Sequence, residues 1–243
     1  MSSGFVRGMR TLAGLAPPAD AVHLRYAPEA YDDRLFAELG IAAPPSLDRA
    51  VAKRRAEFLA GRLAAREALR PLGLADRQVS PGEDRAPQWP PGIVGSISHC
   101  SGHAVALCLE AGTAAGVGID VERIMPAADM GELPAFIAKP AEFELLNGDG
   151  ARPGPAAATL MFSAKESVYK ALFPQVKRIL DHGALELVSH DRTAGALVLA
   201  LGLDLAADLP RGFLAKVRYR RFEDLVVSAC LLASPGDLQA GRG

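Results

Sequence analysis

The apolar segments of this 243-residue chain are all of strand length, which limits what it can fold into. The longest runs, residues 195–203 and 225–233, are far shorter than the roughly 18 residues that a membrane helix needs. Residues 11–16 are too short and too weakly apolar for the core of a signal peptide. The sequence therefore predicts a cytoplasmic protein without a membrane partner.

Helical and strand patterns occupy separate blocks of the chain. Helical composition covers 48–70 and 163–173, and Pro174 is expected to end the second helix. Strand patterns cover 93–98, 104–109, 116–122, 184–188, 196–201, 214–220 and 226–232. Residues 80–92 and 146–157 are expected to be loops, residues 234–243 a disordered tail, and the first fifty residues only short apolar pieces. This mixture indicates an α+β fold.

Overall charge and cysteine content exclude several functions. The net charge of −1 argues against a generally basic nucleic-acid binder, so no nucleic-acid partner is expected. Three cysteines without CxxC or zinc spacing fit a reducing compartment. Glycine motifs typical of Rossmann folds and phosphate loops are also missing.

Asp120 and Glu122 lie two residues apart at the end of a Val-Ile-Val strand pattern. Side chains at this spacing share one face of a strand, about 7 Å apart. Two carboxylates on that face repel each other and resist burial, and a divalent cation such as Mg²⁺ would resolve both problems. A solvated strand end with two ordinary acids is the alternative.

The segment Ser163-Ala-Lys165-Glu166 has two interpretations. Ser163 and Glu166 match a capping box at a helix start, and Glu166 with Lys170 forms a favourable i, i+4 pair. Alternatively, Glu166 is a third metal carboxylate, and Lys165 and Lys170 hold phosphates.

Basic residues concentrate on the expected helix 48–70. Four of its arginines lie within an arc of about 120°, namely Arg54, Arg55, Arg62 and Arg66. A solvated basic face is the usual explanation, and a phosphate-binding face is the alternative. His99, at the end of a strand beside Cys100, is either a hydrogen-bonded structural histidine or a phosphate contact.

The order of four motifs resembles the 4′-phosphopantetheinyl transferases, in particular the monomeric surfactin-type class and its branch similar to enterobactin synthase component D. The motifs are RRAEFLAGR at 54–62, GSISHC at 95–100, GIDVE at 118–122 and FSAKESVYKAL at 162–172. The resemblance implies two similar α+β halves related by a pseudo-twofold axis, with the active site at their interface. We expect the N-terminal half at 1–115 and the C-terminal half at 116–233.

The implied reaction transfers 4′-phosphopantetheine from coenzyme A to a serine of an apo acyl or peptidyl carrier protein and releases adenosine 3′,5′-bisphosphate. The resemblance implies Mg²⁺ on Asp120, Glu122 and Glu166, with phosphates held by Lys165 and Lys170. It further implies a coenzyme A phosphate on His99, the 3′-phosphate on Arg54 and Arg62, and the adenine nucleotide near Arg85.

Displacement at a pyrophosphate phosphorus needs positioning and charge neutralisation more than covalent catalysis. Glu166 is the candidate base for the carrier serine, directly or through a bound water, and Lys170 would offset developing negative charge. The alternatives are a Mg²⁺-dependent pyrophosphate hydrolase and a non-catalytic carrier-binding subunit of a synthase.

Two surfaces are candidates for docking an acidic carrier. One is the basic strand face of Lys216, Arg218 and Arg220, flanked by Arg211 and Arg221, and the other lies near residues 125–143. The alternative for the basic face is a charged edge strand that keeps the protein from aggregating. The carrier would belong to peptide synthetase, polyketide or siderophore biosynthesis.

Overall fold

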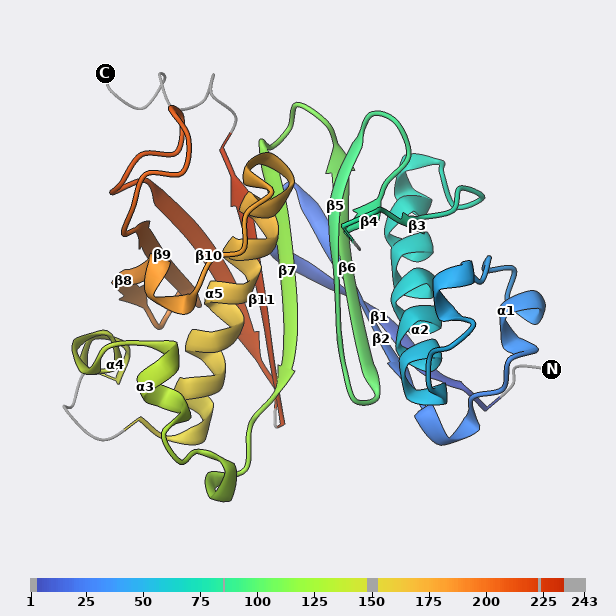
Figure 1. Ribbon diagram of the computed structural model, residues 1–243, viewed down its shortest axis with the longest axis horizontal. Helices are drawn as coiled ribbons and strands as arrows, with labels where there is room; N and C mark the ends of the chain where they lie inside the picture. The colour runs from blue at the N-terminus through green and yellow to red at the C-terminus, as the bar shows by residue number, and fades with distance from the viewer. Residues whose placement is uncertain (1–3, 85, 148–152, 223, 234–243) are drawn as a thin grey trace. The chain divides into compact units, whose positions relative to one another are not determined.

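The computed structural model describes residues 4–84, 86–147, 153–222 and 224–233, which form two compact units, Met1–Ala111 and Gly112–Gly243. Each unit is an antiparallel sheet with one long helix packed against it (Figure 1). The α+β fold class is therefore confirmed. The pseudo-twofold relation between the halves stays a prediction, and the expected tail at 234–243 lies outside the described residues.

Unit 1 has the strand order β1-β2-β6-β5. Its strands are β1 (Val6–Ala16), β2 (Ala19–Tyr26), β5 (Ile93–Cys100) and β6 (His103–Glu110), with a separate two-residue pair, β3 (Ser80–Pro81) and β4 (Pro87–Gln88). Its helices are α1 (Leu35–Glu38), α2 (Ala52–Leu69) and the 3-10 turns Pro28–Ala30, Pro45–Leu47 and Arg70–Leu72. Helix α2 packs on β2, β5 and β6, and the chain turns away at Gly73 in a left-handed conformation.

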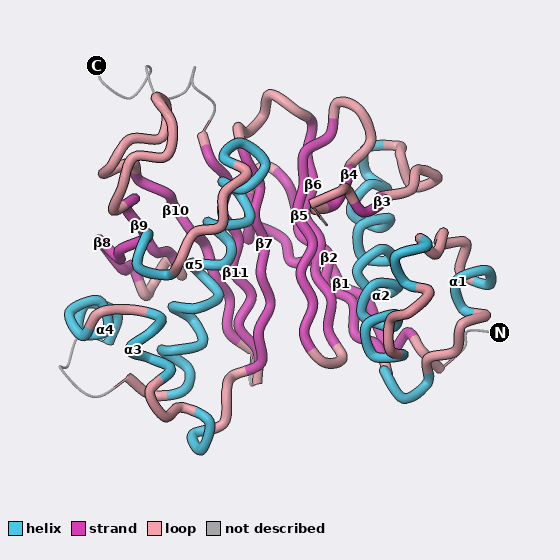
Figure 2. Tube along the Cα trace, in the orientation of Figure 1, coloured by secondary structure: helices cyan, strands magenta, loops and turns pink. Residues whose placement is uncertain are grey.

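Unit 2 has the strand order β7-β11-β10-β9-β8 (Figure 2). Its strands are β7 (Gly116–Arg123), β8 (Leu185–Asp191), β9 (Ala196–Leu201), β10 (Leu214–Arg221) and β11 (Leu225–Leu232). Its helices are α3 (Leu133–Ile137), α4 (Pro140–Asn147), α5 (Pro155–Val176) and the 3-10 turns Ala127–Asp129 and His182–Ala184. Helix α5 packs on β7, β10 and β11.

Three expectations about local structure were wrong. The first fifty residues hold the β1–β2 hairpin, whose β1 is largely exposed and so lacks a clear apolar alternation. Helix α5 begins at Pro155, a residue favoured in the first helical turn, and not at Ser163. It also continues past Pro174 to Val176 and ends at Lys177, which has a φ of 47°.

Candidate active site

Two glycines on β7 let α5 lie directly against the strand. A Cβ added at Gly118 would come within 1.7 Å of the Ser167 carbonyl oxygen, and one at Gly116 within 2.2 Å of the Ala171 carbonyl oxygen. The same face of β7 then carries Asp120 and Glu122, because side chains two residues apart point the same way. The glycine of the GIDVE motif therefore brings the acids of β7 close to α5.

Lys170 of α5 meets Asp120 at this contact. Its Nζ donates to Asp120 Oδ1 at 2.7 Å, and the Asp120 side chain is only 2% exposed. The i, i+4 partnership expected between Glu166 and Lys170 is thus replaced by an ion pair across the helix–strand contact, although Lys170 still acts electrostatically on Glu166. A buried carboxylate of this kind needs such a cation.

Ser163 lies inside α5 and does not cap it. Its side chain is fully buried, and its Oγ is 2.8 Å from the Ser228 Oγ of β11. The capping-box interpretation is therefore wrong, because the helix begins two turns earlier.

Glu122 and Glu166 interact electrostatically with Lys170 and Asp120, and we call these three acids the acidic cluster. Burial raises the pKa of Glu122 to about 7, with Asp120 and Glu166 adding to the rise and Lys170 opposing it. Burial also raises the pKa of Glu166. Within the described part of the chain, no three His, Cys, Asp or Glu side chains are grouped closely enough to hold a metal ion as they stand.

This acidic cluster predicts a pH dependence of stability in protein kept free of divalent cations. A folded-state pKa of about 7, against 4.5 for the unfolded chain, means that the folded state holds this proton more tightly. The free energy of unfolding should therefore fall as the pH rises from 4.5 to 7. Glu122→Gln should remove most of this slope in urea denaturation series run with EDTA at pH 5 and pH 8. Glu110→Gln, at an exposed end of β6, is the control, and equal slopes in wild type and Glu122→Gln would contradict the prediction.

Lys165, which is expected to hold a phosphate, lies among internal polar groups of unit 2. Its side chain is 1% exposed and points into the interior of unit 2. There its Nζ lies 3.0 Å from Glu142 Oε1, 2.8 Å from the Ile137 carbonyl oxygen and 3.0 Å from the His182 carbonyl oxygen. An ammonium group has three N–H donors, and three protein acceptors already engage them. Lys165 therefore has internal partners in this structure, and its phosphate role stays a prediction.

A hollow of about 580 Å³ opens beside Glu166, within the size range of small-molecule sites. We call it the Glu166 hollow. Its lining comes from α3, from α5 and from the segment after α5, and consists of Ala135, Phe136, Glu166, Tyr169 and residues 179–183. Sequence patterns gave no sign of this lining, because its members come from three separate segments and are mostly apolar or small.

Unit 1 brings together three of the residues expected to bind coenzyme A. Arg54 Nη1 and His99 Nε2 are 2.9 Å apart, and Glu57 Oε2 lies 3.8 Å from His99 Nδ1 and 3.9 Å from Arg54 Nη1. The Arg62 guanidinium stacks over the Phe58 ring at 4.3 Å. Glu57 and Phe58 were not predicted, although their spacings of three and four residues from Arg54 and Arg62 along one helix would have indicated contact.

Arg62 is a half-buried cation. Burial and the nearby Arg54 charge lower its pKa to about 10. In the part of the chain that the structure describes, no carboxylate lies within ion-pair distance of it, and its Nε–H is buried without a hydrogen-bond acceptor. Such a group favours an anion from outside the protein.

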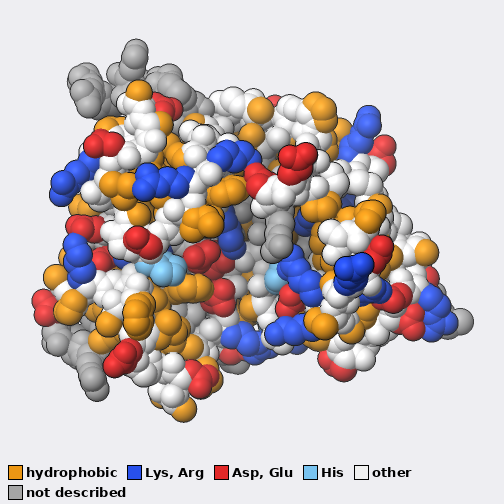
Figure 3. Space-filling model, in the orientation of Figure 1, with side chains coloured by type: hydrophobic (Ala, Val, Ile, Leu, Met, Phe, Trp, Pro, Cys, Tyr) orange, Lys and Arg blue, Asp and Glu red, His pale blue; other side chains and the backbone are white. Residues whose placement is uncertain are grey.

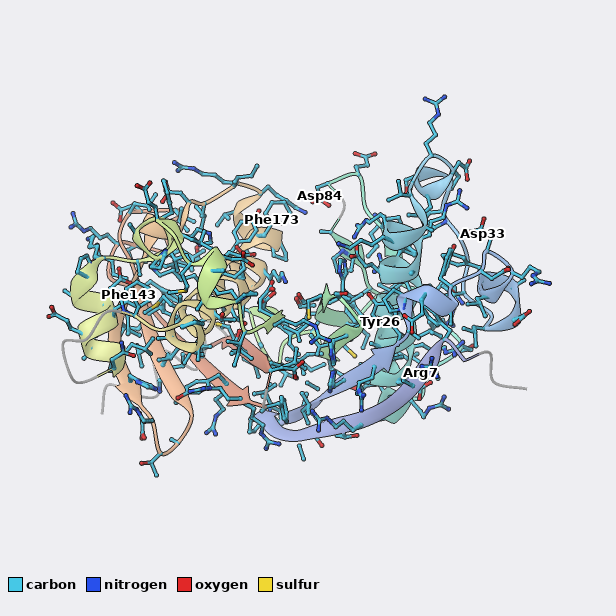
Figure 4. The ribbon with its side chains drawn as sticks, turned by 90° about the horizontal axis from the view of Figure 1, so that it is seen from below. Arg7, Tyr26, Asp33, Asp84, Phe143 and Phe173 are labelled. Atoms are coloured by element: carbon cyan, nitrogen blue, oxygen red, sulfur yellow. The ribbon has the colours of Figure 1, made fainter. Side chains whose placement is uncertain are left out.

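The other two arginines of the predicted basic face have structural partners. Arg55 binds Asp33, labelled in Figure 4, at 2.7 Å, and donates to the carbonyls of Leu47, Asp48 and Ala50. Arg66 donates to the Leu39 carbonyl at 2.5 Å. The basic face of α2 is therefore not simply solvated, and two of its four arginines are already engaged by protein groups. Arg85 lies outside the described residues.

The predicted docking surfaces are both on unit 2. Lys216, Arg218 and Arg220 are exposed on β10, which pairs with β9 and β11 on its two sides. The edge-strand alternative for this basic face is therefore wrong. Figure 3 shows hydrophobic side chains gathered over α3 and α4, where Phe136 is 70% exposed. The described helices include none that is long and apolar enough to cross a membrane.

An α+β protein with acids and a lysine together on one unit and clustered arginines on the other is suited to phosphate chemistry. Residues 43–108 match the family model of the 4′-phosphopantetheinyl transferase N-terminal domain, and residues 116–230 match that of the 4′-phosphopantetheinyl transferase superfamily. The chain is 42% identical over 191 residues to the 4′-phosphopantetheinyl transferase Svp of Streptomyces mobaraensis, which covers 77% of this chain and 76% of that protein.

Two further relatives match shorter stretches. Enterobactin synthase component D of Salmonella typhi is 43% identical over 150 residues, which span 60% of this chain and 61% of that protein. The 4′-phosphopantetheinyl transferase PptT of Mycobacterium tuberculosis is 38% identical over 164 residues, which span 62% and 69%. The chain therefore belongs to the 4′-phosphopantetheinyl transferase superfamily, and the expected transferase class is confirmed.

Proposed function

We propose that this chain transfers 4′-phosphopantetheine from coenzyme A to a serine hydroxyl of an apo acyl or peptidyl carrier protein, releasing adenosine 3′,5′-bisphosphate. The observation that carries the proposal is the contact of β7 with α5, where Lys170 pairs with Asp120 beside Glu122 and Glu166. Charged groups of both signs are concentrated there, as a reaction at a pyrophosphate requires.

The chemistry of the acidic cluster supports a divalent cation. Asp120, Glu122 and Glu166 offer only carboxylate oxygens, the ligands that Mg²⁺ prefers. Their mutual repulsion helps to raise the pKa of Glu122 to about 7, so added positive charge would favour the ionised forms. These three residues would hold Mg²⁺, which when bound supplies charge neutralisation at the diphosphate.

Each side chain then has a defined task. Glu166, at the edge of the hollow, accepts the proton from the carrier serine Oγ as that oxygen attacks phosphorus. The Lys170 ammonium stabilises the negative charge that develops on the phosphoryl oxygens. The Glu166 hollow, lined mainly by apolar and small side chains, is suited to the uncharged pantetheine arm.

The arginine cluster of unit 1 is assigned to the nucleotide. Arg54 and Arg62 hold the 3′-phosphate and His99 another phosphate of coenzyme A, a role that the half-buried Arg62 guanidinium supports. The role of Arg85 and an active site between the two halves remain predictions. For the carrier, the α3–α4 surface is favoured over the basic face of β10, because Phe136 borders the same hollow as Glu166.

Coenzyme A binding gives a sharp test of Arg62. Arg62→Met should weaken coenzyme A binding about 10- to 100-fold, since a charged, bidentate phosphate contact is lost. Binding of dephospho-coenzyme A, which lacks the 3′-phosphate, should hardly change. Lys53→Met removes an exposed charge from the same helix and serves as the control. Calorimetric titration measures both ligands, and equal losses for both would remove Arg62 from the 3′-phosphate.

Mass spectrometry of an apo carrier tests the function itself. With Mg²⁺ and coenzyme A, the carrier should gain about 340 Da on its serine, and a Ser→Ala carrier should gain nothing. No gain across peptide, polyketide and fatty-acid carriers would count against the proposal. Bisphosphate released without any carrier would favour a pyrophosphate hydrolase, and carrier binding without a mass gain would favour a binding subunit.

A further inference from the structure

Lys165 is one of the most deeply buried side chains of unit 2. Its three acceptors come from three different segments: Glu142 from α4, the Ile137 carbonyl from the end of α3, and the His182 carbonyl from the turn before β8. Because every N–H of the ammonium has an acceptor, Lys165 joins these segments to α5 at one point.

Glu142 extends this connection. Its carboxylate is also buried and accepts hydrogen bonds from the backbone N–H of Lys139 and of Leu187, each at 2.9 Å. The buried Lys165–Glu142 pair therefore ties α3, α4, α5 and β8 together. Phe143, the next residue on α4 and labelled in Figure 4, is buried in the hydrophobic core of the same unit.

The segments that Lys165 holds are two walls of the Glu166 hollow. Ala135 and Phe136 of α3 line it just before Ile137, and His182 lines it from the segment after α5. Glu166, the next residue after Lys165 on α5, lines it as well. One ammonium group thus fixes both neighbouring walls relative to the candidate base.

We propose that Lys165 is a positioning residue, whose buried ammonium fixes the walls of the hollow around Glu166, and that it does not bind a phosphate of coenzyme A. The inference rests on the proposed function for the contents of the hollow. A buried ion pair is a poor source of net stability compared with apolar packing. Its contribution here is geometric, because only a charged donor satisfies two carbonyls and a carboxylate together.

Hydrogen exchange tests, independently of catalysis, whether Lys165 holds these segments together. In Lys165→Met, backbone amides of residues 137–139 and 182–187 should exchange faster together, although these segments are distant in sequence. The control is Lys139→Met, which removes the surface ion pair with Glu186 and keeps the Lys139 backbone N–H on Glu142. It should leave both segments unchanged. Unchanged exchange in Lys165→Met would overturn the proposal.

Binding of adenosine 3′,5′-bisphosphate and turnover together separate positioning from phosphate binding. Positioning predicts that the Kd of adenosine 3′,5′-bisphosphate, which lacks the pantetheine arm assigned to the hollow, stays within about twofold of wild type, while kcat falls by about 10- to 100-fold as the walls move. A phosphate ligand predicts a Kd increase of about tenfold or more in Lys165→Met. Such an increase in Kd, together with wild-type amide exchange at both segments, would overturn the proposal.

A double variant covers the case in which Lys165→Met fails to fold because Glu142 is left buried without its cation. Lys165→Met with Glu142→Gln contains no unpaired buried charge, and it should fold with unchanged binding of adenosine 3′,5′-bisphosphate, fast exchange at both segments and low kcat. Wild-type kcat in this double variant would overturn the proposal. If wild type modifies no carrier, the proposed function fails, and hydrogen exchange together with bisphosphate binding still decides the role of Lys165.

Discussion

Glu166→Gln is expected to lower the rate of phosphopantetheine transfer by about 10²- to 10⁴-fold, the usual contribution of a general base. The amide keeps the shape of the side chain but cannot accept the serine proton. Burial already raises the pKa of Glu166, so loss of the charge should not destabilise the fold. Single-turnover transfer to an apo carrier, followed by mass spectrometry, measures the effect.

The control for this substitution is Glu110→Gln, an exposed acid at the end of β6 that should transfer at the wild-type rate. Melting curves should show that both variants fold as wild type does. Transfer by Glu166→Gln at a rate close to wild type would exclude Glu166 as the base and direct attention to Glu122 and Asp120.

Gly118→Ala is expected to destabilise the protein by at least about 3 kcal/mol, the upper range for overpacking. The new methyl group would lie 1.7 Å from the Ser167 carbonyl oxygen and 2.8 Å from the Ala171 backbone nitrogen. Because both are backbone atoms, α5 has to move away from β7. That movement would separate Lys170 from Asp120, so any folded fraction should also transfer slowly.

Gly8→Ala is the matched control for this substitution. Gly8 lies on β1, and a Cβ built there meets no atom within 4 Å. Urea denaturation should place it close to wild type. A Gly118→Ala protein with wild-type stability and activity would show that α5 does not depend on this close approach.

The sequence predicted the regular elements wherever their side chains alternate or repeat clearly. The strand expected at 196–201 has those bounds, and the one expected at 214–220 extends by a single residue to Arg221. Prediction was poorest where pairing partners decide the structure. Strand β1 is mostly exposed and is held by pairing with β2, and Ser163 belongs to a helix interior because α5 begins before it.

The candidate site divides in the same way. Residue types and motif order predicted Asp120, Glu122, Glu166 and Lys170 as site residues, because carboxylates and a lysine in this order match the family motifs. Two lysines five residues apart on α5 nevertheless make different contacts. Lys170 reaches Asp120 at the helix–strand contact, whereas Lys165 points to the opposite side and is buried against Glu142.

The sequence by itself determined the α+β class and the family, and it predicted which acids and lysines belong to the candidate site, because local patterning and side-chain chemistry are properties of the residues. Only the tertiary structure decided which lysine meets the acids and which one is buried, and which segments line the hollow. Those outcomes depend on how closely α5 can approach β7 and on which oxygen atoms lie around each lysine ammonium. Such contacts join segments that are distant in sequence, so they form only when the chain folds.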